Sequence, residues 1–245
     1  RMSVEQDELF EEWTGDDRAA ITVADLMAMS SGLEFNEDYG DVTDVTRMLY
    51  LQPDMASFAS EKPLAGPIGG TFNYSSGTTV LLSRIWQDAF DDPAAALAWP
   101  QDALFGPLGM TSAVLEADAR GTYVGSSYLY ATARDWVRFG EFLRLDGVWK
   151  GRQILPAGYV DWMREEASAS EGAYARGQLW LQGPGEQGNA SQGVPEDAFW
   201  LRGHDGQSIA IVPSRNLVVL RMGLTPSKLA YRPQRLVAAL SAVLP

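Results

Sequence analysis

Residues 203–223 read GHDGQSIAIVPSRNLVVLRMG, and this stretch decides the fold class. Within it, residues 208–212 and 217–222 are rich in the β-branched and aliphatic side chains that strands favour. The four residues between them, Pro-Ser-Arg-Asn, have the composition of a short turn that joins antiparallel strands. The stretch therefore predicts a β-hairpin and, with it, an antiparallel sheet.

Helical patterns lie on both sides of this hairpin. Residues 131–145, ATARDWVRFGEFLRL, place Trp136, Phe139 and Phe142 on one face of a helix. The Gly- and Gln-rich residues 183–193 predict a loop. Thr22 and Pro93 stand where an N-cap and a first helical residue are expected. The helices predicted from these patterns cover residues 21–30, 78–89, 93–105, 131–145, 156–165 and 229–243.

Helices and strands are unevenly distributed along the chain. We expect a mostly helical subdomain over residues 1–167, followed over residues 168–245 by the C-terminal strands and helix of an α/β subdomain. Together they predict one α+β domain, in which an antiparallel sheet is flanked by helices and accompanied by a helical subdomain. The sequence contains no internal repeat that would indicate a solenoid.

The composition excludes several classes of function. The 245 residues are 46% hydrophobic and carry a net charge of −13, which argues against a nucleic-acid partner. No apolar run approaches the roughly 20 residues that a membrane-spanning helix needs. With no cysteine and a single histidine, we expect neither disulfides nor a metal site, and no sequence feature indicates a cofactor.

The first residues, Arg1-Met2-Ser3, contain neither an initiator methionine nor the apolar region of a signal peptide. We therefore expect further residues upstream of Arg1 in the parent protein. A chain without cysteine suits the periplasm or secretion, and the cytoplasm stays open as the alternative.

Two short segments carry chemistry-bearing side chains. Tyr74-Ser75-Ser76 follows a Gly-Gly pair, and His204-Asp205-Gly206 opens the hairpin. Alone, each has a structural explanation, because Tyr74 fits a core tyrosine with a bonded hydroxyl and His204 fits a turn. Their order along the chain, with the longer segments around them, carries more information than either alone.

In that order, the segments resemble the serine β-lactamase and penicillin-binding-protein superfamily, in particular its esterase-like branch related to class C enzymes. The resemblance spans nearly the whole chain, and its longer segments are the specific ones. It implies a β-lactamase/transpeptidase-like fold that is incomplete at the N-terminus. The segments that carry it are ITVADLMAMSSGLEF (21–35), FNYSSG (72–77), YATARDWVRFGEFLRLDGVWKGRQILP (130–156) and GHDGQSIAIVPSRNLVVLRMG (203–223).

The family's chemistry needs a serine nucleophile with a lysine three residues later on one helical face. Position minus three of the lysines Lys62, Lys150 and Lys228 holds an alanine, a glycine and a threonine, so the 245 residues contain no such pair. In the family, this pair lies upstream of the segment that residues 1–15 resemble. We expect it in a missing upstream segment or on another chain, which would pack beside the C-terminal helix. A pseudoenzyme is the alternative.

The resemblance implies a role for each matching residue. Tyr74 would relay the proton together with the absent lysine, and Ser76 stands where many relatives carry asparagine. His204 takes the position of a lysine in the strand segment, and the backbone N–H of Gln207 would donate to the oxyanion. Gly206 would let the substrate backbone approach closely.

The implied reaction proceeds through an acyl-enzyme on a small ester or amide substrate. Histidine in place of lysine weakens recognition of a β-lactam carboxylate, since it is mostly neutral at pH 7. β-Lactamase, D-Ala-D-Ala carboxypeptidase and a non-catalytic binding module remain alternatives. Three aromatic residues are candidates for the acyl pocket, with a core role as the equal alternative: Tyr130, Trp180 and Trp200.

Overall fold

The computed structural model describes residues 3–185 and 188–244. Contacts between residues group the chain into two compact units. The first holds Arg1–Ala103, Val114–Tyr130 and Ala167–Ser170, and the second holds Leu104–Ala113, Ala131–Glu166 and Glu171–Pro245. Helices dominate the first unit and the second contains an antiparallel sheet, so the expected α+β class is confirmed. The division at residue 167 stays a prediction, although every described strand longer than two residues follows it.

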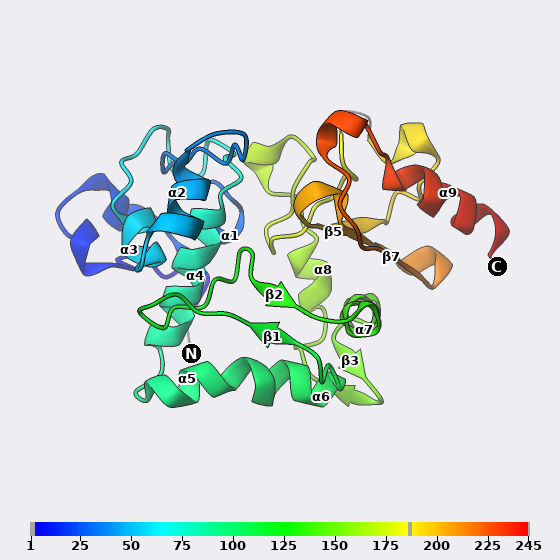
Figure 1. The fold of residues 1–245 in the computed structure, drawn as a ribbon, viewed down its shortest axis with the longest axis horizontal. Helices are drawn as coiled ribbons and strands as arrows, with labels where there is room; N and C mark the ends of the chain where they lie inside the picture. The colour runs from blue at the N-terminus through cyan, green and yellow to red at the C-terminus, as the bar shows by residue number, and fades with distance from the viewer. Residues whose placement is uncertain (1–2, 186–187, 245) are drawn as a thin grey trace. The chain divides into compact units, whose positions relative to one another are not determined.

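One helix organises the core of the first unit. This helix, α4 (Ser76–Asp88), packs against α1, α2, α3 and α5 and buries Val80, Leu81 and Ile85. Its position fixes Tyr74 and Ser76, which lie at its N-terminal end. The elements around it, labelled in Figure 1, are α1 (Val23–Met27), α2 (Asp44–Leu51), α3 (Met55–Ser60), α5 (Pro93–Pro100), β1 (Val114–Leu115) and β2 (Leu129–Tyr130).

Capping residues define where these helices begin. Thr22 caps α1 as predicted, and Asp25 completes a capping box with it. The helix ends at Met27, three residues earlier than predicted, because Met29 adopts a left-handed backbone with φ 56°. The helix predicted from residue 78 already begins at residue 76, since the Ser75 hydroxyl accepts the N–H of Thr78 at 3.1 Å.

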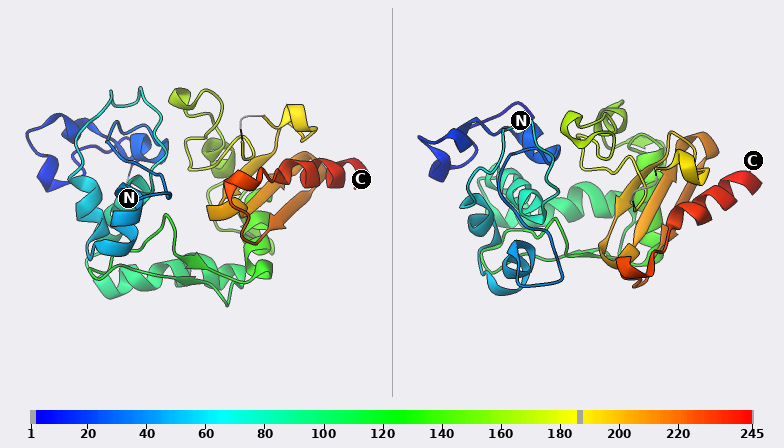
Figure 2. Two further views of the ribbon diagram at one scale, coloured as in Figure 1. Left: turned by 45° about the horizontal axis from the view of Figure 1, so that its top comes forward. Right: turned by 90° about the horizontal axis from the view of Figure 1, so that it is seen from above.

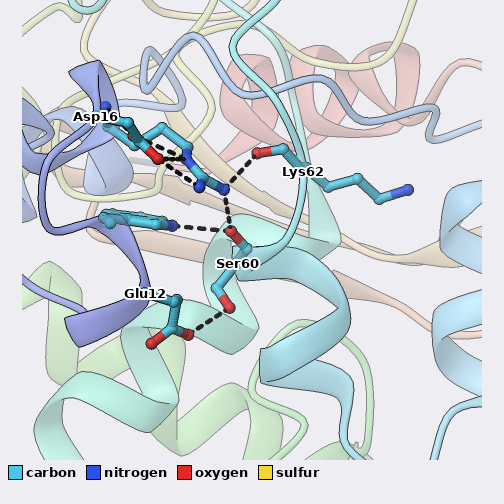
Figure 3. A network of polar contacts seen from close by, with 6 residues as sticks. Glu12, Asp16, Ser60 and Lys62 are labelled. Carbon is cyan, nitrogen blue, oxygen red and sulfur yellow. Dashed lines mark hydrogen bonds and ion pairs between the residues drawn. The ribbon is translucent and has the colours of Figure 1, made fainter.

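A polar network fixes the segment before α1 to the end of α3 (Figure 3). The Arg18 guanidinium donates to the carbonyls of Ser60 at 2.8 Å and Lys62 at 3.2 Å. The Trp13 indole N–H donates to the same Ser60 carbonyl at 2.8 Å, and the Ser60 hydroxyl donates to Glu12 at 2.7 Å. These donors satisfy carbonyl groups that the end of a helix leaves without partners.

The second unit contains the predicted hairpin. The strands β5 (Phe199–Arg202), β6 (Ser208–Val212) and β7 (Leu217–Arg221) are antiparallel neighbours in that order. The turn between β6 and β7 closes at Asn216, whose left-handed φ of 48° an asparagine tolerates. The prediction of a hairpin and of an antiparallel sheet is therefore confirmed.

Helices cover both faces of this sheet. Every residue of β6 is buried, and its side chains alternate between α7 (Ala133–Arg144) and α9 (Pro233–Val243). On the α7 face, a Cβ added at Gly140 would lie 2.7 Å from Val218 Cγ1 and 3.1 Å from Ile209 Cγ2. On the other face, Val237 of α9 packs with the β6 residue Ala210. Figure 2 shows α9, in red, beside the orange strands.

The remaining elements of this unit are short: α6 (Gly106–Leu108), β3 (Val148–Trp149), β4 (Arg152–Gln153) and α8 (Tyr159–Met163). The helix predicted over 156–165 is wrong at its start, because Gly158 has a left-handed φ of 75° and α8 follows it. The helix predicted from residue 229 begins at Pro233, whose ring suits the first helical turn. A π-helical turn (Gln101–Phe105) ends the helix predicted over 93–105.

Candidate active site

Tyr74 lies in the first unit, directly before the capped start of α4. Its side chain is half-buried, whereas Ser75 and Ser76 are only 3% and 4% exposed. Ser75 serves the helix as its N-cap, so its hydroxyl accepts the N–H of Thr78. This arrangement leaves Tyr74 as the partly accessible member of the segment.

A second segment, residues 33–37, is fixed against the Tyr74 segment. The Asn73 side-chain amide donates to the carbonyls of Leu33 at 3.3 Å and Phe35 at 3.2 Å. Beside it, a Cβ added at Gly77 would lie 2.6 Å from the Phe35 ring, so only glycine permits this approach. These contacts bring Glu37 to the start of α4.

Glu37 binds Ser76 with both carboxylate oxygens. It accepts the Ser76 backbone N–H at 2.8 Å and the Ser76 hydroxyl at 2.5 Å, and the Tyr39 hydroxyl donates to it at 3.2 Å. Burial raises the pKa of Glu37 above its ordinary value, although these hydrogen bonds act against the shift. Burial, together with the nearby Glu37, also raises the pKa of Tyr39. The Ser76 hydroxyl is thus hydrogen-bonded to Glu37 in this structure. Its predicted role toward a substrate stays a prediction.

The strand segment lies in the second unit, in the turn between β5 and β6. The His204 side chain is 55% exposed, and its Nε2 lies 3.7 Å from Asp205 Oδ2, too far for a hydrogen bond. Asp205 and Gly206 have positive φ angles of 52° and 80°, which form the turn. The Gln207 N–H is directed back to the His204 carbonyl at a long 3.4 Å.

The three aromatic candidates differ in their surroundings. Trp200 is fully buried within the sheet core and donates its indole N–H to Asn189 at 3.2 Å, which favours the core alternative for this residue. Trp180 is half-buried and carries the Arg202 guanidinium 3.9 Å above its ring. Tyr130, in the first unit, is 52% exposed. A pocket role for Tyr130 and Trp180 stays a prediction.

The sequence interpretation missed three residues that contact the candidate site. Glu37 and Tyr39 follow the family-like segment 21–35 at once, so their position beside it was the available signal. Arg221 ends the otherwise apolar strand β7 and donates to the carbonyl of Gly206. A charged residue at the end of an apolar strand was its signal.

The described residues hold no grouped metal ligands and no membrane-spanning helix, and they form a cavity away from the candidate site. Over residues 3–185 and 188–244, no three histidine or acidic side chains are grouped so that they could hold a metal ion. In the same ranges, no helix has the length and apolarity needed to cross a membrane. The second unit has a cavity of about 370 Å³, and none of the predicted site residues lines it. Its lining comprises Arg164, Glu166, Gly172, Leu181, Gln182, Glu196, Asp197, Ala198 and Phe199.

Comparison with known proteins identifies the family. A family model described as Beta-lactamase matches residues 7–243. The chain belongs to the beta-lactamase family. Beta-lactamase-family proteins are generally hydrolytic enzymes, and the predicted resemblance to this superfamily is confirmed. No curated protein matches the sequence.

Solved structures of the same fold come from several kinds of hydrolase and binding protein. A putative 6-aminohexanoate-dimer hydrolase from Bacillus anthracis is 22% identical, with a TM-score of 0.74 over 99% of this chain and 65% of its own. The hydrolase EstCE1 is 14% identical, with a TM-score of 0.69 over 98% and 78%. A penicillin-binding-protein homologue from Caulobacter crescentus is 16% identical, with a TM-score of 0.68 over 99% and 77%. At these identities the likeness describes the fold, and this chain spans 65% of the first of these structures.

Proposed function

We propose that this beta-lactamase-family chain is the larger part of a serine hydrolase that cleaves esters or amides through an acyl-enzyme. The observation that carries the proposal is the family match over residues 7–243, with the tyrosine and strand segments in the family's order. The fold neighbour EstCE1 is itself a hydrolase with promiscuous acyltransferase activity, which fits acyl-enzyme chemistry. The proposal places the nucleophilic serine and its lysine in a segment outside these 245 residues.

Each matching residue has a role in the proposed reaction. Tyr74 passes the serine proton onward, and it needs a cation nearby because an ordinary phenol has a pKa of about 10. The upstream lysine supplies that cation. The backbone N–H of Gln207 stabilises the oxyanion, next to Gly206, and Ser76 and His204 contact the substrate. Tyr74 and Gln207 belong to different units, so their action on one substrate is part of the proposal.

The proposed substrate is a simple ester or amide without a carboxylate beside the scissile bond. His204 stands where a lysine would hold such a carboxylate, and an imidazole lacks the permanent charge of a lysine ammonium group. Ser76 offers fewer donors than the asparagine found in many relatives. β-Lactamase and D-Ala-D-Ala carboxypeptidase activity remain the alternatives within the same chemistry.

The test is to label the complete protein, including its upstream segment, with a fluorophosphonate probe and to locate the modified serine by mass spectrometry. We expect labelling upstream of Arg1, together with burst hydrolysis of p-nitrophenyl butyrate. The 245-residue chain alone should show no burst, since it has no serine–lysine pair at the required spacing. A burst from the chain alone that Ser76→Ala abolishes would show that the nucleophile has been misplaced.

The proposed substrate preference has its own test. In the complete protein, His204→Lys adds a permanent positive charge to the strand segment, whereas the matched variant His204→Gln stays neutral. We expect the lysine variant alone to improve turnover of carboxylate-bearing esters relative to neutral esters. An equal change for both substrate types would contradict the recognition role of His204.

A non-catalytic binding module is the second candidate function. It is favoured by the absence of a serine–lysine pair from the 245 residues. The two functions are separated by the parent reading frame. A serine–lysine pair within several tens of residues before Arg1 supports the hydrolase, and its absence supports the binding module.

The proposed upstream segment also needs a place to pack. Among the described residues, β7 pairs with a strand on one side only, and Leu236 and Val243 of α9 are 41% and 76% exposed. We propose that the segment covers this apolar surface. Adding it should raise the melting temperature of the chain, whereas an unchanged melting temperature would place the segment elsewhere.

A further inference from the structure

The turn after β5 contains the Gly206–Gln207 peptide, whose N–H and carbonyl have hydrogen bonds of unequal quality. The Gly203 N–H donates to the Gln207 carbonyl at 2.8 Å and closes the turn. Within the turn, the Gln207 N–H reaches the His204 carbonyl only at 3.4 Å, which is long for an N–H···O bond. The other end of the same peptide, the carbonyl of Gly206, is bound by a charged donor.

That donor is Arg221, the last residue of β7. Its guanidinium donates to the Gly206 carbonyl at 3.0 Å and to the Gly223 carbonyl at 2.7 Å, and it also binds the Thr225 hydroxyl. The ring of Tyr231 lies 4.6 Å below it. The Arg221 side chain therefore connects the turn, the residues that follow β7 and Tyr231, which precedes α9.

A second contact holds the same turn. The Thr225 N–H donates to the Asp205 carbonyl at 2.7 Å, so consecutive carbonyls of the turn are both bound. Gly206 makes this approach feasible, because an added Cβ would lie 3.1 Å from the Thr225 carbonyl and 3.3 Å from Arg221 Nη1. Its left-handed φ of 80° also favours glycine.

The chemistry of the peptide group links Arg221 to Gln207. The Gly206 carbonyl and the Gln207 N–H belong to one planar, conjugated unit, so fixing the oxygen fixes the direction of the N–H. A charged donor on the oxygen draws electron density toward it and makes the N–H a stronger donor, as hydrogen bonds in a chain polarise one another. Oxyanion donors need both properties, a fixed direction and a strong positive end.

We propose that Arg221 is a positioning residue for the oxyanion hole, which orients and polarises the Gly206–Gln207 peptide. This inference rests on the proposed function, in which the Gln207 N–H faces the oxyanion. A lysine would fill the role only in part, because the planar guanidinium bonds two carbonyls and a hydroxyl at once.

The first experiment measures the peptide directly and needs no activity. In ¹⁵N-labelled 245-residue chain, we compare the amide resonance of Gln207 in the wild type, Arg221→Met and Arg221→Lys. Arg144→Met is the matched control, since the guanidinium of Arg144 binds Glu141 and Asn216, which lie outside the 203–207 turn. The Gln207 amide proton should move upfield in Arg221→Met, partly recover in Arg221→Lys and stay unchanged in the control. An unchanged Gln207 resonance in a folded Arg221→Met chain overturns the proposal.

The second experiment measures the consequence in the complete protein with its upstream segment. Removing an oxyanion donor costs about 10²–10³ in kcat, so weakening one through Arg221→Met should slow acylation about tenfold with KM nearly unchanged. The loss should be smaller for a thionoester, whose sulfur is a poorer hydrogen-bond acceptor than oxygen. Equal losses for ester and thionoester indicate a merely structural role and overturn the inference. If the wild type forms no acyl-enzyme, the proposed function fails, while the Gln207 resonance still decides the role of Arg221.

Discussion

Two serines in different parts of the molecule are held by carboxylates in nearly the same way. In the first unit, Glu37 accepts the backbone N–H and the hydroxyl of Ser76 at 2.8 and 2.5 Å. In the second, Asp135 accepts the backbone N–H and the hydroxyl of Ser112 at 2.9 and 2.5 Å. The pKa values nevertheless shift in opposite directions, upward for Glu37 and downward for Asp135.

The difference lies in what compensates burial. The hydroxyl of Ser112 is the largest cause that lowers the pKa of Asp135, and Arg138 adds an ion pair to the same carboxylate. Glu37 receives its hydrogen bonds from Ser76 and Tyr39, which are neutral, and burial dominates. The ion pair and the Ser112 hydrogen bonds offset the cost of burying Asp135, so we call Asp135 with Arg138 the compensated pair and expect it to contribute to stability. Glu37 has no such cation, and this uncompensated carboxylate lies beside the Tyr74 segment. Perturbed pKa values cluster at functional sites, and of the two carboxylates Glu37 is the one that contacts a predicted site residue.

The largest effect is expected from breaking the compensated pair. Asp135 is 2% exposed, and Asp135→Ala removes the acceptor of the Ser112 backbone N–H and hydroxyl together with the ion pair to Arg138, so we expect a loss of about 2–3 kcal/mol in the free energy of unfolding. Urea unfolding at pH 7 measures it. The matched control is Asp161→Ala, which removes another i,i+3 pair to an arginine with an aspartate that is 80% exposed, and it should cost under about 0.5 kcal/mol. Similar losses in both variants would contradict the comparison.

The sequence was sufficient for the elements whose signals are local. The hairpin of β6 and β7 follows from its aliphatic runs and from Asn216, and α1 follows from the Thr22 cap. Where a start was misplaced, the cause was also local. The left-handed Gly158 delays α8, and the Ser75 cap brings α4 forward. These details depend on backbone conformations that several residue types can adopt.

Contacts within the candidate site could not be predicted from local sequence patterns. Ser76 and Glu37 are 39 residues apart, and Arg221 reaches Gly206 across 15 residues. Each contact exists only because tertiary packing brings two segments together, as Asn73 does for residues 33–37. Tyr74 and His204 were chosen through family resemblance, which identifies a position but not its neighbours.

The next largest effect is the pH dependence of the stability that Asp135 contributes. Because the pKa of Asp135 is lowered on folding from 3.8, its ionised form is favoured by the native state. The stability advantage of the wild type over Asp135→Asn should be complete at neutral pH and decline as the pH falls below about 3.8. Urea titrations of both proteins at several pH values measure it. An advantage that stayed constant down to pH 2 would contradict the shift.

The uncompensated carboxylate should behave in the opposite sense. Glu37→Gln replaces one acceptor oxygen by an amide and should cost about 1 kcal/mol at low pH through the lost hydrogen bond. Because the pKa of Glu37 is raised from 4.5, the wild type loses stability as the pH rises through that raised value, and the gap to the variant should narrow. Urea unfolding between pH 4 and 8 measures the gap. A gap that widens with pH would show that Glu37 is compensated after all.

The smallest effect separates the two causes at Asp135. Arg138 is 42% exposed, so solvent screens its charge, and Arg138→Met should cost no more than about 1 kcal/mol at pH 7. Ser112→Ala removes the hydroxyl that lowers the pKa of Asp135 most. The pKa of Asp135, followed by NMR titration of its carboxyl carbon, should therefore rise more in Ser112→Ala than in Arg138→Met. If Arg138→Met gave the larger rise, the ion pair rather than the Ser112 hydroxyl would be the main cause of the lowered pKa of Asp135. The contrast between the two carboxylates would then rest on charge, because each accepts a backbone N–H and a hydroxyl from one serine, Glu37 with both oxygens and Asp135 with Oδ2 alone.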